Sequence, residues 1–351
     1  MAPVTEHQGS FLSRISRRNQ IVSMDVNHDQ ELKELEEFQK QVAQRFTELD
    51  SPESDPILSI QWLRKLLDAF MSCESEFQSV LTTNPAQISK PLVPEMLDRI
   101  VKALDICTAV VNGVDSVRQS QRLAEIAVTA LKQQPLSDGS VRRAKRALTS
   151  LLAALNSDKS SGGSGRRSTE QSSSFGRGGC VSKNWSASKQ IQAMAANLVL
   201  PRGGEASPMF IMSSVMVMVM WTLVAAVPCQ ASNGLTVHLP FPRHQVWASA
   251  ATSIQERIGE ELKRKEKRCG GGGLMEEMQR MERIGLKLMV FTDGFRFDGE
   301  EEVKTQVEEM EEICRKMEDG LEGLQRQVRE VFHRLVKSRS EILEAIDHCN
   351  I

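Results

Sequence analysis

Apolar residues recur at intervals of three and four over residues 29–156, which is the spacing of one face of an α-helix. The stripes are separated by dipeptides that interrupt helices, such as Ser51-Pro52 and Asn84-Pro85. Helix starts are predicted at Asp29, Asp55, Pro94, residue 121 and Asp138. No comparable run alternates polar and apolar residues, so this segment is predicted to be helical.

The most regular pattern lies in residues 301–347, where apolar positions alternate at four and three residues through about six heptads. Its seam consists of Val303, Val307, Met310, Cys314, Met317, Leu321, Leu324, Val328, Val331 and Leu335. Such a seam could bind a partner helix, or it could pack inside a bundle of its own chain. Further along, Phe332, Val336, Leu343 and Ile346 widen the stripe beyond a two-stranded seam. This widening favours packing inside a bundle.

A third kind of pattern covers residues 209–227, which are nearly all apolar and lie in a stretch without charge between Glu205 and Arg243. About 19 residues make roughly 29 Å of helix, just enough to cross a bilayer core. The candidate residues include Met209, Phe210, Met216, Val219, Trp221 and Val227.

Two interpretations of this apolar helix compete. Length, lack of charge and the closing Pro228 favour a single transmembrane span, whose amino-terminal side would face the cytosol by its excess of basic residues. Five methionines and the amphipathic helices on both sides favour a buried central helix. A span would also put the cysteines that follow it outside the cytosol, which suits free thiols badly.

Two segments lack helical stripes. Residues 157–182 are rich in Ser and Gly and are predicted to be a disordered linker before a second helical segment, residues 183–351. Residues 1–28 are predicted to be a basic flexible tail. Alternatively, a short amphipathic helix there could rest on anionic lipid. Its lipid contacts would be Phe11, Arg14, Arg17 and Arg18.

The predicted fold class is therefore mainly α. We expect a multi-helix bundle with a long heptad helix, a flexible Ser/Gly linker, and one apolar helix that is either a core helix or a single span. Composition agrees, because tyrosine is absent and only 5% of the residues are aromatic, whereas strands favour aromatic residues.

Charge and cysteine usage narrow the class of protein. The 44 basic residues nearly balance the 46 acidic ones, so no basic field favours nucleic acid. Seven cysteines are scattered singly, without a Cys-x-x-Cys pair, which suits reduced thiols in the cytosol. A cytosolic location, a membrane-associated one, or both are expected.

The sequence contains no recognisable catalytic motif. Gly270–Gly273 lacks the Lys-Ser/Thr of a phosphate loop, and the six histidines have no metal-ligand spacing. The carboxylates near Glu300 and Glu312 suit a solvated helix face better than an acid–base pair. We therefore expect a protein that is not an enzyme and uses no cofactor, metal or small-molecule substrate.

Several stretches resemble a plant family, the BYPASS/ROH-type proteins, and the likeness covers nearly the whole chain apart from the linker. The matching stretches are residues 8–20, 185–200, 212–221, 285–291 and 324–333. The resemblance implies an intracellular regulator of plant growth and polarised secretion, and its ROH-type branch implies association with the exocyst through Exo-seventy subunits. It supplies no catalytic motif and no binding residue.

Two functional hypotheses follow. In the first, the protein is a helical adaptor that docks on an exocyst subunit of the Exo-seventy type and modulates polarised exocytosis. In the second, it is a single-pass, membrane-anchored scaffold in developmental signalling, and residues 209–227 are its essential element.

Overall fold

The computed structural model describes residues 11–83, 90–156, 185–196, 198, 207–229, 235, 237–242, 245–267, 273–294 and 300–349. For residues 11–29, 31, 90, 266, 300–302 and 347–349 it describes the helix alone. Within these ranges the chain is helical and contains no strand, which confirms the predicted class. The helices are α1 (Phe11–Asp50), α2 (Ile60–Thr83), α3 (Val93–Leu131), α4 (Asp138–Asn156), α5 (Ala187–Ala196), α6 (Pro208–Ala226), α7 (Ala248–Lys267), α8 (Glu276–Asp293) and α9 (Glu300–Cys349).

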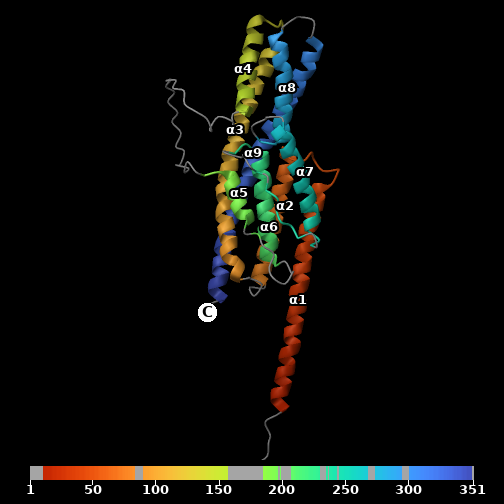
Figure 1. Ribbon diagram of the computed structural model, residues 1–351, viewed down its shortest axis with the longest axis vertical. Helices are drawn as coiled ribbons and strands as arrows, with labels where there is room; N and C mark the ends of the chain where they lie inside the picture. The colour runs from red at the N-terminus through yellow and green to blue at the C-terminus, as the bar shows by residue number, and fades with distance from the viewer. Residues whose placement is uncertain are drawn as a thin grey trace, which may run out of the picture.

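The helices form an elongated bundle (Figure 1). Helices α4 and α8 make up one end, and α1 runs past the opposite end. Helix α9 packs on α2 and α3, and α6 packs on the same two helices. The two helical segments, residues 29–156 and 183–351, therefore contribute to one continuous hydrophobic core. The predicted linker, residues 157–182, lies outside the described residues.

Helix α6 lies at the centre of this core. It contacts α1, α2, α3, α5 and α7, and all 19 of its residues are buried. Its start is set by Ser207, whose hydroxyl accepts the Phe210 amide hydrogen, and by Pro208 at the first helical position. Among the described residues it is also the one helix that could cross a membrane by length and composition. The methionine-rich apolar run is thus a core helix in this structure.

The amino end of α2 is fixed by residues far away in the sequence. The helix was predicted to start at Asp55, but it begins at Ile60. There the Ser59 hydroxyl accepts the Trp62 amide hydrogen, and the Glu277 carboxylate accepts that of Ile60 at 3.0 Å. Glu277 is 217 residues further along the chain, so no local pattern could indicate where α2 starts.

Two further boundaries differ from prediction. The helices expected after Pro94 and near residue 121 are one continuous helix, α3, because no proline interrupts the chain between them. Helix α1 begins at Phe11 and not at Asp29. Residues 11–50 contain neither proline nor glycine, the two residues that most disfavour a helix. No helix-breaking residue therefore stops α1 from extending back from Asp29 to Phe11.

A short backbone clasp closes the carboxyl end of α6. The amide hydrogens of Leu274 and Met275 are donated to the carbonyls of Ala225 and Ala226 at 2.9 and 3.0 Å. These bonds satisfy two of the last carbonyls of α6, which have no partner within the helix. A Cβ atom added at Gly273 would lie 2.0 Å from the Ala226 carbonyl oxygen. Only glycine allows the two backbones to approach this closely.

Gly273→Ala is therefore expected to destabilise the protein by about 2–3 kcal/mol, because the clash separates the clasp and leaves carbonyls without partners. Gly259→Ala is the matched control, since a Cβ added there meets nothing within 4 Å. In the middle of α7 the control should raise stability by roughly 0.5–1 kcal/mol. Urea unfolding of both variants measures the difference, and equal stabilities would contradict this account of the clasp.

The buried carboxyl group of Glu277 makes the stability of the folded protein depend on pH. Burial raises the pKa of this carboxyl above its ordinary value of 4.5, although the bond from the Ile60 amide opposes the shift. The folded state therefore holds the proton to a higher pH than the unfolded state does. The contribution of Glu277 to stability is fully present below pH 4.5 and is lost as pH rises through the raised pKa.

We expect Glu277→Gln to remove this part of the pH dependence, because its amide oxygen can still accept from Ile60 but cannot ionise. The measurement is the free energy of urea unfolding from mildly acidic to neutral pH. Wild type should lose stability relative to the variant as pH rises. Glu282→Gln, at a half-buried carboxylate on the same helix, is the control. A wild-type slope in Glu277→Gln would show that another group carries the effect.

Candidate interaction surface

Buried thiols offer little nucleophilic or metal-binding chemistry. Burial raises the pKa of Cys73, Cys107 and Cys314 to about 12 in each case. These thiols stay protonated at neutral pH, whereas the thiolate is the reactive and metal-binding form. In the part of the chain that the structure describes, no three His, Cys, Asp or Glu side chains are placed to hold a metal ion.

The predicted partner-helix seam lies inside the bundle of this chain. Nine of its ten positions are buried: Val307, Met310, Cys314, Met317, Leu321, Leu324, Val328, Val331 and Leu335. Val303 is half-buried and packs against the same core. The seam faces α2 and α3, so it is not open to a partner helix. The broad stripe was correctly interpreted as a sign of bundle packing.

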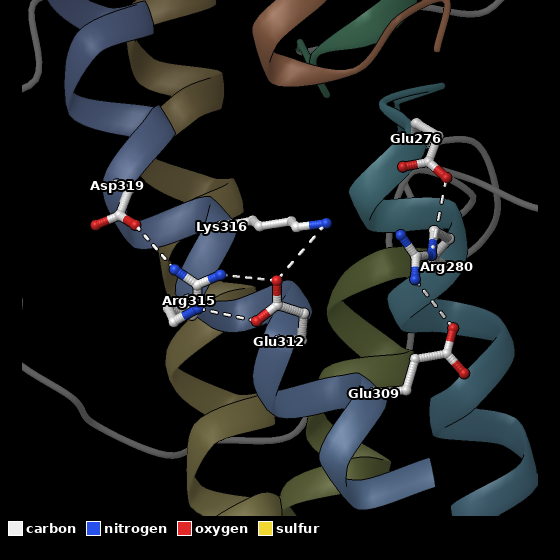
Figure 2. Close-up of polar contacts among 7 residues, drawn as sticks. All are labelled: Glu276, Arg280, Glu309, Glu312, Arg315, Lys316 and Asp319. Carbon is white, nitrogen blue, oxygen red and sulfur yellow. Dashed lines mark hydrogen bonds and ion pairs between the residues drawn. The ribbon is translucent and has the colours of Figure 1, made fainter. Parts of the chain in front are cut away.

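The opposite side of α9 carries ion pairs. Figure 2 shows Arg280 of α8 between Glu276 and Glu309, at 3.8 and 3.1 Å. The second of these pairs links α8 to α9. Another inter-helix pair joins Lys132, just after α3, to Glu311 at 2.7 Å.

One turn further along α9, Arg315 donates two hydrogen bonds to Glu312, at 2.9 and 2.7 Å, and lies 3.7 Å from Asp319 (Figure 2). These bonds hold the pKa of the Glu312 carboxyl below its ordinary value. Lys316 adds a weaker contact at 3.7 Å. Such exposed pairs contribute little to stability. The carboxylates are engaged with cations along a solvated helix face, as the sequence indicated.

An exposed apolar surface runs along the line where α3 meets the second half of α9. The two helices are antiparallel, since Gln121 bonds the Cys314 carbonyl and Gln325 bonds Asp115. A hollow of about 160 Å³ lies further along, between residues 107–112 and 328–333. Extending this register places Val336 beside Leu104 and Leu343 beside Leu97. We call this surface the α3/α9 strip: Leu97, Val101, Leu104, Val111, Phe332, Val336 and Leu343.

The α3/α9 strip includes three well-exposed aliphatic side chains. Val101 is 46% exposed, Val336 44% and Leu343 38%. Leu97, Leu104, Val111 and Phe332 are half-buried against the core. Contiguous exposed apolar surface of this kind marks sites that bind other molecules.

Comparison with known proteins then places the chain. The profile of the family described as "Protein ROH1-like" matches residues 2–346. The chain belongs to the ROH1-like family. This confirms the resemblance to ROH-type proteins that the sequence motifs indicated.

Two ROH1-like relatives come from Arabidopsis thaliana. Protein ROH1A is 54% identical to this chain, over 99% of this chain and 98% of its own length. Protein ROH1D is 36% identical, over 98% of each. No solved structure matches the chain.

The sequence pattern only partly indicated the α3/α9 strip in this ROH1-like chain. The spacing of Leu97, Leu104 and Val111 predicts a core stripe on α3, but in the structure all three are half-buried at the edge of the core. Val101 was missed, although it is one turn after Leu97 and continues the same face. On α9, the sequence did indicate the strip, because Val336 and Leu343 widen the apolar stripe beyond the buried seam.

The amino-terminal lipid-contact residues are placed only as backbone. Phe11, Arg14, Arg17 and Arg18 belong to α1, but their side chains lie outside the described residues. That hypothesis stays a prediction.

Proposed function

We propose that this ROH1-like chain is a non-enzymatic adaptor that binds an exocyst subunit of the Exo-seventy type and modulates polarised exocytosis in plant cells. The α3/α9 strip is the observation that carries the proposal, because it is an exposed apolar surface on a helical scaffold. The exocyst is named on the basis of the ROH-type resemblance. Under this proposal the protein acts in the cytosol.

The dimensions of the strip suit a partner helix. From Leu97 to Val111 the strip extends about 21 Å at 1.5 Å per residue. An amphipathic helix of about four turns, with apolar residues at i, i+3, i+4 and i+7, would cover it. The hollow near Phe332 would receive the largest apolar side chain of that helix.

Basic side chains along one edge of the strip indicate which charge the partner helix should carry. Arg329, His333 and Lys337 are exposed on α9 at successive four-residue intervals beside Phe332 and Val336. An apolar partner helix with Asp or Glu along one edge would complement them. Binding should therefore weaken as salt concentration rises.

Replacing Val101 and Val336 together by Lys is expected to weaken binding to a purified Exo-seventy subunit by roughly 10–100-fold, since two apolar contacts are replaced by desolvated charges. Both positions are well exposed, so the melting temperature should stay near that of wild type. Isothermal titration calorimetry measures the affinity.

Val246→Lys is the matched control, because Val246 is an exposed valine outside the strip. It should bind as wild type does. If the double variant also binds as wild type does, the strip is not the binding surface. Failure of wild type to bind any Exo-seventy subunit would contradict the choice of partner.

A membrane-anchored scaffold is the second candidate, and the length and apolar composition of α6 favour it. Burial of α6 by its own chain on every side supports the first candidate instead. Alkaline extraction of membranes from expressing cells separates the two. Release into the supernatant supports the adaptor, whereas retention with a protease-protected carboxyl-terminal tag supports the scaffold.

A further inference from the structure

A second exposed apolar surface lies at the end of the bundle formed by α4 and α8. Leu286 is 52% exposed and Val290 is 73% exposed. They are one turn apart on α8, so both side chains project from the same side of the helix. Half-buried Met289 lies next to them, against the core. Helix α8, which carries them, lies at the end of the bundle opposite the carboxyl terminus of α9 (Figure 1).

Helix α4 lies beside α8 in an antiparallel orientation. Lys145 of α4 forms an ion pair with Asp293 of α8 at 2.6 Å. One turn on, the Thr149 hydroxyl lies 4.0 Å from the Met289 sulfur. These contacts place the exposed face of α4 next to Leu286 and Val290.

That face of α4 is strongly basic. Arg142, Arg143, Lys145 and Arg146 are all exposed within its first turns. On α8, Arg283 and Lys287 are exposed beside Leu286. The acidic residues of the same region are Asp138, Glu282 and Asp293, together with Glu276 and Glu309, which both pair with Arg280. Asp138 is paired with Arg142 at 2.6 Å, and Asp293 with Lys145. Seven basic side chains against five acidic ones leave a net positive surface around two exposed aliphatic side chains.

We propose that this α4/α8 face docks the protein on the surface of an anionic lipid bilayer. The basic side chains would lie at the phosphate and carboxylate headgroups, and Leu286 and Val290 would insert at the boundary with the acyl chains. Both kinds of group are needed for stable attachment, since each alone binds a membrane weakly. An acidic peptide would be attracted by the same charges, but exposed aliphatics on an outer helix favour the lipid surface.

This proposal is independent of the adaptor function. The α4/α8 face and the carboxyl-terminal part of α9 lie at opposite ends of the bundle (Figure 1). A molecule held on lipid through α4 and α8 would therefore keep the α3/α9 strip accessible. The attachment is peripheral and needs no membrane span.

Co-sedimentation of the full chain with phosphatidylcholine vesicles, with and without phosphatidylserine, tests the proposal. Wild type should bind only the vesicles that contain phosphatidylserine, and binding should decrease with salt. Arg143→Gln combined with Arg146→Gln should weaken binding about 25-fold, from about fivefold per basic residue. Leu286→Ser combined with Val290→Ser should weaken it at least about tenfold with the charges intact.

Lys263→Gln combined with Lys267→Gln is the control, because it removes two exposed basic charges from α7. It should bind as wild type does, and circular dichroism should show that all variants keep their helices. If the control lost vesicle binding to the same extent, the net charge of the protein alone would explain the binding, and the proposal would be wrong. Binding to soluble polyglutamate without binding to vesicles would assign the face to an acidic peptide instead. If the variant with serine at Leu286 and Val290 bound the vesicles as wild type does, these two side chains would not insert into the bilayer, and the proposal would be wrong.

Discussion

Replacing Met216 by Arg is expected to unfold the protein. Met216 is fully buried near the middle of α6, a helix with no charged residue. An unpaired buried charge costs about 3–5 kcal/mol or more. That is a large part of the 5–15 kcal/mol that typically stabilises a folded protein. Soluble yield and urea unfolding measure the loss, and most of the variant should aggregate.

Met216→Leu is the matched control, since it keeps the side-chain volume and apolar character and should cost less than about 1.5 kcal/mol. The pair of variants also separates the two interpretations of α6. In a membrane span, Arg at this position should reduce insertion by about 2.5–3.5 kcal/mol and leave the soluble helices folded. Recovery of Met216→Arg as a folded, soluble protein of wild-type stability would contradict the core position of α6.

Trp62→Ala is expected to destabilise the protein by about 3–5 kcal/mol. Trp62 is fully buried in α2, and its indole Nε1 donates to the Leu49 carbonyl at 3.0 Å. Truncation leaves a cavity and a carbonyl without its partner. The connection between the end of α1 and the start of α2 should loosen first. Urea unfolding gives the magnitude.

Trp62→Phe weighs the two causes against each other, because it removes the hydrogen bond but keeps a six-membered aromatic ring in the core and so leaves a much smaller cavity than alanine does. It should cost about 1–2 kcal/mol. If Trp62→Ala were as stable as Trp62→Phe, filling of the core at this position would not matter, and the account given for Trp62 would be wrong.

Helix type and approximate extent could be predicted from the sequence because they depend on local spacing. Helices α6 and α9 lie within a residue or two of their predicted ranges. The start of α2 could not be predicted, since the cap of Ile60 comes from Glu277. The choice between core helix and span was also open, because burial of Met216 depends on helices that are distant in the sequence.

The candidate site was harder to predict than the fold. Amphipathic stripes show which residues are apolar, but not how far each lies from the centre of the packed face. Leu104 and Cys107 belong to one stripe of α3, yet only Cys107 is fully buried. Exposure of Val101 and Val336 depends on the register of α3 against α9, and this register depends on side-chain contacts such as Gln325 with Asp115.

Helices from the first and last parts of the chain share one core, and this affects how the protein folds while it is being synthesised. Helix α6 is made well before α9, although both pack on α2 and α3. Ribosomes add about 5–20 residues per second, so the 125 residues after α6 take about 6–25 seconds to appear. During that interval the apolar faces of α2 and α3 that pack on α9 in the finished protein stay uncovered. A nascent chain arrested before α9 should therefore associate with chaperones more strongly than the completed protein does.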